Sequence, residues 1–216
     1  MTTATLQFSA NNYVDWWQQT HASRQDAQTM WESSDRSFRD HLVGAVRLCL
    51  PATSLYELGC GAGPNLRRLR AACPDLILGA SEPCDPLAAW VEEHLSITPD
   101  RTALPEPPLG QWDLLVSCYV LSYLDDQEVT HALRALHRPR PQALILLEPD
   151  MGAVGFEGLG YRMNDATGEP FLPVWFHDYP KLLPATGWTI QWRWPFPQTG
   201  ALVYTELRTI VVAVPA

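Results

Sequence analysis

Three glycines alternate with other residues between positions 59 and 63, and they form the part of the chain best suited to hold a small ligand. They follow the short apolar stretch 54–58 and precede Pro64, a favoured first residue of a helix. Glycine lets a ligand approach the backbone closely, and the start of the helix offers free N–H groups. The residue types therefore predict a strand, a ligand-binding turn and a helix.

The spacing of the glycines disfavours a dinucleotide as the ligand. A dinucleotide turn reads G-x-G-x-x-G, whereas this one reads G-x-G-x-G and has Pro64 where the third glycine would fall. Proline has no N–H to donate to a phosphate. Glu57, two residues before the first glycine, would repel a pyrophosphate but suits a ligand that carries an ammonium group.

A second carboxylate ends the next apolar stretch, 76–82. An ionised Glu82 at the end of a strand can accept hydrogen bonds from both hydroxyl groups of a ribose. The alternative role is that of a helix cap, for which Asp85 followed by Pro86 is the better candidate.

Two longer apolar runs, 112–118 and 143–149, predict parallel strands that are buried on both faces. Cys118 and Tyr119 stand at the end of the first run, and Glu148 stands at the end of the second. Ligands of open α/β sheets bind beside the carboxyl ends of the strands. We therefore expect these side chains to border the same site as the glycine turn.

In this order, the segments resemble the motifs of class I S-adenosylmethionine-dependent methyltransferases over roughly residues 54–150. The stretch 57–63 is similar to the first motif of that family, (E/D)-x-G-x-G-x-G. Residues 100–105 resemble its D-A-x-x-L-P stretch, although Arg101 replaces the usual small residue, and Trp112-Asp113 resembles the start of its fourth strand.

The resemblance implies a cofactor, S-adenosyl-L-methionine, and a product, S-adenosyl-L-homocysteine. It implies that the methionine moiety packs on the turn residues Gly59, Cys60, Gly61 and Gly63. Glu57 would help to place the amino group, Glu82 would hold the ribose, and Cys118 would lie beside the reactive methyl group. Asp100 would face the adenine amino group, although a plain turn at 99–100 is the alternative.

The resemblance also implies the fold class: α/β, with a seven-stranded, mostly parallel sheet, an antiparallel last strand and helices on both faces. Residues 54–216 would form this Rossmann-like core, and residues 1–53 a helical lid over the cofactor, within one compact domain. A helix from Ser34 or Asp35 to Leu50 carries an apolar stripe. The stretches 188–194 and 209–214 predict an antiparallel pair of strands.

Aromatic residues on both flanks of the core are candidates for contacts with the substrate. Tyr13, Trp16 and Trp17 lie in the predicted lid, where aromatic rings could shield a sulfonium and attract it. Trp175 and Tyr179 lie in a predicted pocket loop before a short helix. For each of these residues, packing alone is the alternative role.

Three residues are candidates for catalysis. His177, on the same predicted pocket loop, is the best general base because its pKa is ordinarily near neutrality, and a hydrogen-bonded loop histidine is its alternative role. Tyr119 would lie beside the reactive methyl group. Glu148 would either orient the substrate or hold backbone N–H groups. Asp178 is expected to cap the helix that follows.

The composition of the chain disfavours several classes of binding partner. The 216 residues include 46% hydrophobic residues, which suits one α/β domain. The net charge of −9, with a single lysine, disfavours nucleic acid, and the absence of a long apolar run disfavours a membrane. Five cysteines without a C-x-x-C pair predict reduced thiols and no metal site.

These observations predict a cytoplasmic, monomeric or homodimeric methyltransferase that acts on a small-molecule acceptor. Whether oxygen, nitrogen or carbon is methylated stays open, because the donor is already activated and a base is not always required. A non-catalytic S-adenosylmethionine-binding regulatory or scaffold protein is the alternative. Pro64 and Glu57 argue against a third possibility, a dinucleotide oxidoreductase.

Overall fold

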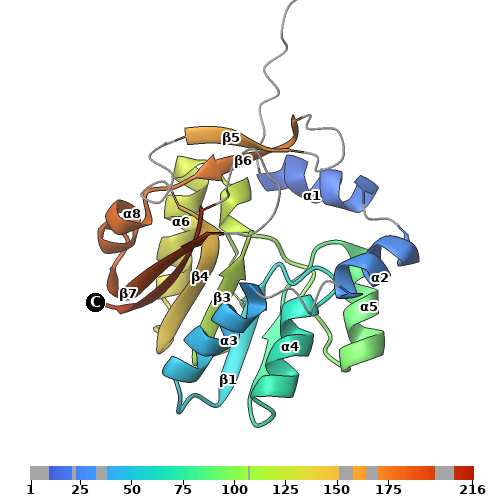
Figure 1. Ribbon diagram of the computed structural model, residues 1–216, viewed down its shortest axis with the longest axis horizontal. Helices are drawn as coiled ribbons and strands as arrows, with labels where there is room; N and C mark the ends of the chain where they lie inside the picture. Colours follow the sequence, from blue (N-terminus) through green and yellow to red (C-terminus); the bar gives the residue numbers. More distant parts are fainter. Residues whose placement is uncertain are drawn as a thin grey trace, which may run out of the picture.

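A six-stranded sheet forms the centre of the molecule in the computed structural model, which describes residues 10–20, 23–32, 38–106, 108–150, 158–163, 170–197 and 207–216 (Figure 1). The strands are β1 (Ser54–Leu58), β2 (Ile77–Ala80), β3 (Leu114–Cys118), β4 (Ala143–Pro149), β7 (Trp188–Pro197) and β8 (Leu207–Pro215). Their order is β2-β1-β3-β4-β8-β7, and β1 to β4 are parallel. β8 is antiparallel to both β4 and β7, as predicted for the last two strands.

The predicted seventh strand of this sheet is not confirmed within the described residues. Beyond β2 there is only an isolated parallel bridge between Ser81 and Asp100. Asp100 N–H donates to the Ala80 carbonyl and Glu82 N–H donates to the Asp100 carbonyl, both at 2.9 Å. Pro99, the preceding residue, has no N–H with which to extend the ladder.

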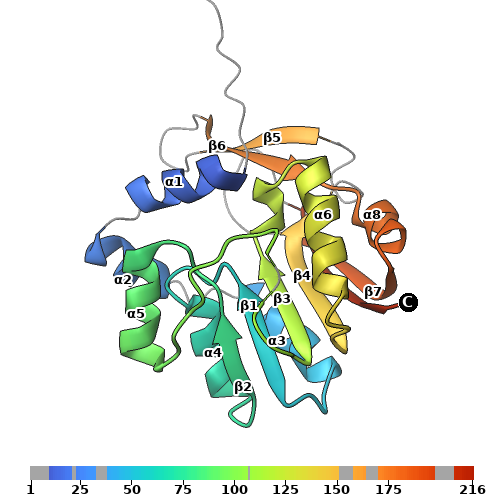
Figure 2. The same cartoon turned by 180° about the vertical axis from the view of Figure 1, so that it is seen from behind.

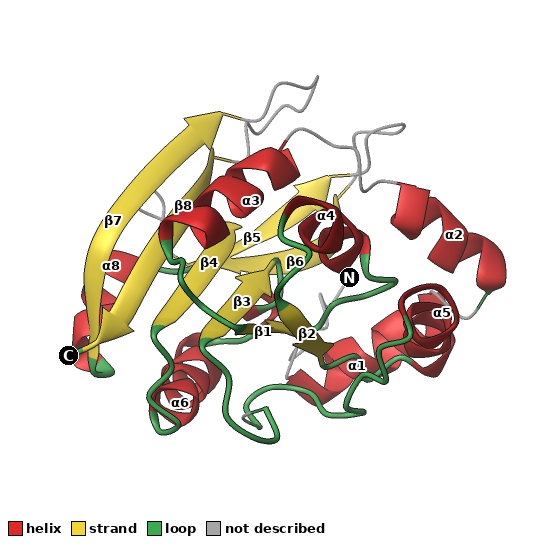
Figure 3. Ribbon diagram, turned by 90° about the horizontal axis from the view of Figure 1, so that it is seen from below, coloured by secondary structure: helices red, strands yellow, loops and turns green. Residues whose placement is uncertain are grey.

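Helices cover both faces of the sheet (Figure 3). The helices that flank the sheet are α3 (Phe38–Leu48), α4 (Pro64–Ala72), α5 (Asp85–Leu95), α6 (Asp126–His137) and α8 (Tyr179–Ala185). The Asp178 carboxylate caps α8 by accepting from Lys181 N–H, as predicted. At α5, by contrast, Cys84 is the N-cap residue and Asp85 is the first helical residue.

Two apolar cores lie on opposite faces of the sheet. One packs α3 and α4 against the strands, and the other packs α6 and α8 against them. The predicted stripe on α3 is part of the first core, with Leu42, Ala45 and Val46 fully buried. The predicted lid therefore cannot extend to residue 53, because α3 belongs to the core. Ser34 and Asp35 lie outside the described residues.

Four elements lie at the end of the sheet where the parallel strands terminate (Figures 1 and 2). They are α1 (Ala10–Thr20), α2 (Arg24–Glu32), β5 (Gly158–Met163) and β6 (Pro170–Phe176). β5 and β6 form a separate antiparallel pair. Trp175, predicted to lie in a loop, is therefore part of a strand.

None of the described helices has the length and apolar character that crossing a membrane requires.

Candidate functional site

The glycine turn has the geometry that its sequence predicts. Gly59, Gly61 and Gly63 have φ angles of 59°, 58° and 79°, in the left-handed region that favours glycine. Gly63 is the N-cap residue of α4, and Pro64 begins the helix. Cys60 N–H donates to the Ser81 carbonyl at 2.9 Å, which ties the turn to the end of β2.

Side chains from two other segments pack closely against this turn. An ideal Cβ at Gly59 would lie 2.8 Å from Cγ2 of Val120, and one at Gly61 would lie 2.5 Å from Sδ of Met30. The Met30 sulfur, from α2, also accepts a hydrogen bond from Ala62 N–H at 3.2 Å. The turn therefore needs glycine both for its backbone angles and for the close approach of its neighbours.

Glu57 and Asn65 form a buried pair beneath the turn. Asn65 Nδ2 donates to Glu57 Oε1 at 2.6 Å, and the two residues are only 1% and 4% exposed. Glu57 Oε2 and Asn65 Oδ1 are buried and have no hydrogen-bond partner. Burial raises the pKa of Glu57 to about 8, although the Asn65 hydrogen bond and the charge of Arg39 act in the opposite direction.

Glu82 links the end of β2 to the same turn. Its carboxylate accepts from Gly61 N–H at 2.7 Å and from Cys84 N–H at 2.8 Å, one bond on each oxygen. Burial raises the pKa of Glu82 to about 7, against these two hydrogen bonds. Because each carboxylate oxygen can accept a second bond, Glu82 can still accept from a ligand.

Asp100 lies at the edge of the sheet and is half-buried. Its carboxylate accepts from the Tyr56 hydroxyl at 2.6 Å, a contact that the sequence did not reveal. Arg101 turns away to carboxylates of α5, Asp85 at 3.1 Å and Glu92 at 3.5 Å. Asp100 is thus fixed beside β2 by its backbone bridge and by its side chain.

The segment after β3 is held by Glu148, at the end of β4. Its carboxylate accepts from the Ser117 hydroxyl at 2.6 Å and from the backbone N–H groups of Val120, Leu121 and Ser122 at 3.0, 3.1 and 3.4 Å. Glu148 is fully buried, which raises its pKa to about 7 against these hydrogen bonds. This geometry supports the holding of backbone N–H groups, the second of the two roles considered for Glu148.

Glu148 thereby shapes the end of β3 on the side of the glycine turn. Tyr119 has a φ of 59°, which is uncommon for a bulky residue, and half-buried Cys118 precedes it. Val120, which follows, is the residue that packs on Gly59. Cys118 and Tyr119 directly precede Val120 in the chain, so they lie next to the residue that packs on Gly59.

His177 is 1% exposed and uses both ring nitrogens. Nε2 lies 3.2 Å from the Leu121 carbonyl and 3.0 Å from the Leu124 carbonyl, and Nδ1 lies 3.2 Å from Asp126 Oδ1. Burial lowers the pKa of His177, although these partners raise it. This arrangement favours a structural role, in which His177 holds the segment after β3, over the role of general base.

The aromatic residues of α1 gather on the segment that Glu148 and His177 hold. Tyr13 is 3% exposed, and its ring centroid lies 4.9 Å from that of Tyr123 in η2 (Leu121–Tyr123). Trp17 lies 6.0 Å from Tyr123 and 5.3 Å from Trp16, centroid to centroid. Val174 of β6 completes this aromatic cluster.

The two aromatic residues predicted near His177 do not belong to the aromatic cluster. Tyr179 is fully buried in the core on the α6 and α8 face, so packing is the role that its position supports. Trp175 is half-buried in β6, and its buried Nε1 has no hydrogen-bond partner.

Sequence reasoning missed four residues of this region: Met30, Arg39, Asn65 and Tyr123. Asn65 had a usable signal, since it is the second residue of the helix that starts at Pro64. Met30 and Arg39 had none, because packing between distant elements brings Met30 to the turn and buries Arg39 on α3. Tyr123 lies in a short 3₁₀ segment that no periodicity marks.

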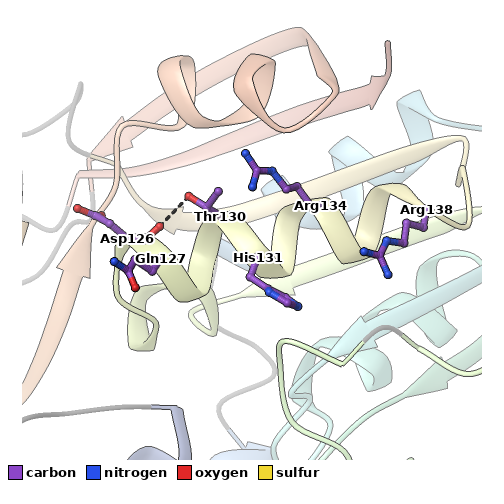
Figure 4. A pocket seen from close by; sticks show the side chains of 6 residues that line it. All are labelled: Asp126, Gln127, Thr130, His131, Arg134 and Arg138. Atoms are coloured by element: carbon purple, nitrogen blue, oxygen red, sulfur yellow. Dashed lines mark hydrogen bonds between the residues drawn. The ribbon is translucent and has the colours of Figure 1, made fainter.

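A pocket lies along one side of α6 (Figure 4). It is lined by Asp126, Gln127, Thr130, His131, Arg134 and Arg138. The first five belong to α6 and Arg138 is its C-cap residue. None of the six contacts the glycine turn by any described hydrogen bond, and Asp126 is joined to the candidate site only through His177.

Comparison with known proteins shows the fold. No family model matches the chain, and no curated protein matches it in sequence. The structure of magnesium protoporphyrin IX methyltransferase (ChlM) from Synechocystis PCC 6803, with bound S-adenosylmethionine, is similar with a TM-score of 0.65 and 17% identity, over 100% of both chains.

Two further structures agree with it. Streptomyces venezuelae DesVI has a TM-score of 0.64 and 16% identity, over 91% of this chain and 98% of that one. The sugar N-methyltransferase KedS8 from Streptoalloteichus has a TM-score of 0.61 and 20% identity, over 87% and 92%. The chain therefore has the α/β fold that these three structures share.

Proposed function

We propose that this protein is an S-adenosylmethionine-dependent methyltransferase that acts on a small-molecule acceptor. The observation that carries the proposal is the glycine turn together with the two buried carboxylates, Glu57 and Glu82, at the carboxyl ends of β1 and β2. The likeness to methyltransferase structures adds support, and the printed names of two of them specify small acceptors, a magnesium porphyrin and a sugar.

The residues at the turn fit the cofactor. Glu57 Oε2 and Asn65 Oδ1 are buried acceptors without donors, and an ammonium group would supply those donors. Glu82 retains capacity to accept from the ribose hydroxyls. The backbone of Gly59 to Gly63 would bear the methionine moiety, with Asp100 toward the adenine and Cys118 toward the methyl group.

Bound S-adenosylmethionine supplies an activated methyl group, and S-adenosylhomocysteine is the product. The chain itself has to align the acceptor with that group and exclude water. Glu148 and His177 act as positioning residues, because their hydrogen bonds hold the segment that carries Tyr119 and Val120. We assign α1 and α2 the role of a lid, with Tyr13, Trp16 and Trp17 facing the acceptor.

Trp175 is retained as a candidate contact of the acceptor, and Tyr179 as a packing residue behind it. We infer from composition that the protein is cytoplasmic and acts as a monomer or homodimer without nucleic acid. Trp194, 62% exposed on the edge strand β7, is the apolar side chain best placed for a contact between two copies.

A non-catalytic S-adenosylmethionine-binding protein is the second candidate. The observation that favours it is the full use of His177 and Glu148 in hydrogen bonds, which leaves neither of them as a base. A catalyst remains the first choice because an amine, thiol or carbon acceptor can react without one.

Transfer of a radiolabelled methyl group from S-adenosylmethionine to a panel of amino sugars, phenols and porphyrin carboxylates tests the proposal. We expect product with at least one class, and none with the Gly61→Arg variant, whose side chain would collide with Met30 at a positive φ. Gly44→Arg is the matched control, since a Cβ at Gly44 meets nothing within 4 Å. Cofactor binding without transfer to any acceptor would favour the second candidate.

A further inference from the structure

An ion pair joins the end of β4 to the edge strand β7. Arg193 Nε donates to Asp150 Oδ2 at 2.6 Å, and the Asp150 side chain is fully buried whereas that of Arg193 is 28% exposed. Asp150 directly follows β4, and its backbone forms a bridge with His177. The pair therefore lies at the same end of the sheet as the glycine turn and reaches the surface through Arg193.

The Arg193 side chain has to cross β8 to reach Asp150, because β8 lies between β4 and β7 (Figure 3). Arg193 is the register partner of Val211, and Thr209 stands two residues before Val211 on β8. Register partners, and residues two apart in one strand, share a face of the sheet. Arg193 and Thr209 are therefore diagonal neighbours on one face, about 7–8 Å apart at the backbone, which an arginine side chain can span.

Thr209 is flanked by the ion pair from its other side as well. It is the register partner of Glu148, which stands two residues before Asp150. The carboxylate that Arg193 reaches is thus also a diagonal neighbour of Thr209. The three side chains converge over β8.

Two polar atoms of this cluster are unused. Arg193 Nη2 and Thr209 Oγ1 are buried, and neither has a hydrogen-bond partner in the part of the chain that the structure describes. Thr209 as a whole is 1% exposed. Buried polar groups are ordinarily satisfied, so two neighbouring donors without an acceptor mark a place where an acceptor atom is expected to bind.

The charge of the surroundings favours an uncharged ligand group. Asp150 already balances the Arg193 guanidinium, and Glu148 adds a second buried carboxyl group, whose pKa burial raises to about 7. The three groups together carry no net positive charge, so a further anion would be repelled. A carbonyl oxygen accepts two hydrogen bonds and has neither a charge nor a proton of its own.

We propose that Arg193 and Thr209 bind a neutral carbonyl group of the methyl acceptor, with Arg193 Nη2 and the Thr209 hydroxyl donating to one oxygen. The inference deepens the proposed function and rests on it, because the site is assigned to the acceptor. The two residues would determine specificity, since a substrate without the carbonyl leaves both donors buried and unsatisfied.

The carbonyl would lie away from the atom that is methylated. The glycine turn follows β1, and β3 and β4 lie between β1 and β8. Three strand spacings of about 4.8 Å separate the turn from Thr209 by about 14 Å. A contact so far from the reacting atoms stabilises the ground state and the transition state alike, so its loss should raise KM and spare kcat.

Thermal unfolding of the ligand-free protein tests whether the Thr209 hydroxyl is unsatisfied. Thr209→Val should keep the melting temperature or raise it by up to about 3 °C, because it removes a buried hydroxyl without a partner and nearly preserves the volume. Thr189→Val, exposed on β7, is the matched control. A fall in the melting temperature of Thr209→Val beyond that of the control would show that the protein itself satisfies the hydroxyl and would overturn the proposal.

Binding of a small carbonyl probe, trifluoroacetamide, to the complex with S-adenosylhomocysteine tests the site directly by fluorine NMR. We expect wild-type protein to bind the probe with a dissociation constant of about 1–10 mM, and trifluoroacetate at least about threefold more weakly. Arg193→Lys, which keeps the charge beside Asp150, and Thr209→Val should each weaken the probe about two- to tenfold, as the loss of one hydrogen bond would give. Arg70→Lys, exposed on α4, should have no effect.

Methyl transfer gives the corresponding kinetic test once an acceptor is found. Arg193→Lys and Thr209→Val should raise its KM about two- to tenfold and leave kcat within about twofold. A lowered kcat with an unchanged KM, or an acceptor that contains no carbonyl group, would overturn the inference. Should Arg193→Lys fail to fold, Thr209→Val decides.

Three results would overturn the inference and leave the proposed function standing. Protein that binds S-adenosylhomocysteine but no probe at about 100 mM would hold only water at this site. Tighter binding of trifluoroacetate than of trifluoroacetamide would show an anion site, and equal affinities of wild-type protein and both variants would place the probe elsewhere. Failure of S-adenosylhomocysteine itself to bind would overturn the proposed function, and this inference with it.

Discussion

Three buried glutamates lie at or just beyond the carboxyl ends of the parallel strands β1, β2 and β4, and each holds a different part of the site. Glu57 pairs with Asn65, Glu82 holds the glycine turn, and Glu148 holds the segment after β3. Glu148 accepts four hydrogen bonds from the chain, three on Oε1 and one on Oε2, whereas Glu82 accepts two and Glu57 accepts one. Glu148 therefore supports the chain, and for Glu57 and Glu82 we propose ligand binding.

Replacement of Glu148 by alanine should unfold the protein more easily. Ser117, Val120, Leu121 and Ser122 would lose their common acceptor, and one buried unsatisfied group already costs about 1–3 kcal/mol. We expect the free energy of unfolding in urea to fall by about 3 kcal/mol or more.

Glu148→Gln is the comparison variant. Because glutamine keeps one acceptor oxygen, its free energy of unfolding should fall by less than half as much as that of Glu148→Ala. Glu106→Ala, at an exposed position, should change stability by no more than about 0.5 kcal/mol. A fall of similar size in Glu148→Ala and Glu106→Ala would contradict the supporting role.

At the residue scale, sequence identified Glu57, Glu82 and the glycines because their roles follow from position at a strand end. It assigned His177 chemistry that its buried, fully used nitrogens do not favour. Neither the burial of His177 nor that of Arg39 can be deduced from local sequence, since both result from packing between distant elements.

At the scale of elements, α2 is the helix that covers the turn. Ala27 is fully buried, Arg24 pairs with Glu93 of α5 at 2.7 Å, and Met30 accepts from Ala62 N–H. An exposed ion pair such as Arg24–Glu93 contributes little to stability, so the apolar contacts and Met30 determine the position of α2. A cofactor on the turn and the Met30 sulfur would contact the same backbone.

Met30→Ala should therefore tighten the binding of S-adenosylhomocysteine. The cofactor would no longer have to displace the contact between Met30 and Ala62, and a net hydrogen-bond energy of about 0.5–1.5 kcal/mol corresponds to about two- to tenfold in affinity. The dissociation constant from calorimetry is the measurement. Thr29→Ala, exposed on the same helix, should have no effect, and weaker binding by Met30→Ala would show that this side chain helps to hold the cofactor.

The elements themselves were largely predictable. Apolar runs predict β1 to β4, with an acid at or just after the end of β1, β2 and β4, and alternation predicts the β7 and β8 pair. In place of the predicted seventh strand the described residues have only a bridge at Asp100, after Pro99. The predicted loop at Trp175 is the strand β6, whose Pro170 and Pro173 are atypical of a strand. The packing of α3 into the core was visible only as a stripe, which does not tell a core helix from a lid.

At the scale of the whole molecule, buried carboxylates link stability to pH. The pKa values of Glu57, Glu82 and Glu148 are raised to about 8, 7 and 7 from an ordinary 4.5. The folded protein therefore keeps protons that the unfolded chain has released. The stability from these groups is present below about pH 4.5 and is lost as the pH rises through 7 to 8.

The melting temperature of the cofactor-free protein should accordingly fall between pH 6.5 and pH 8.5 when followed by differential scanning fluorimetry. The lowered pKa of His177 acts in the opposite direction, but mainly below pH 6.5, so it does not obscure this window. Glu57→Gln should flatten the decline. A melting temperature that is constant or rises over this range in wild-type protein would contradict the account of buried acids.

The proposed methyl transfer requires that the glycine turn binds S-adenosylmethionine. Calorimetric titration of protein stripped of any retained cofactor tests this most directly. We predict binding of one S-adenosylmethionine per chain with a dissociation constant of about 1–100 μM, and the same stoichiometry for S-adenosylhomocysteine. No heat of binding from folded protein with either ligand at about 1 mM would contradict the central claim.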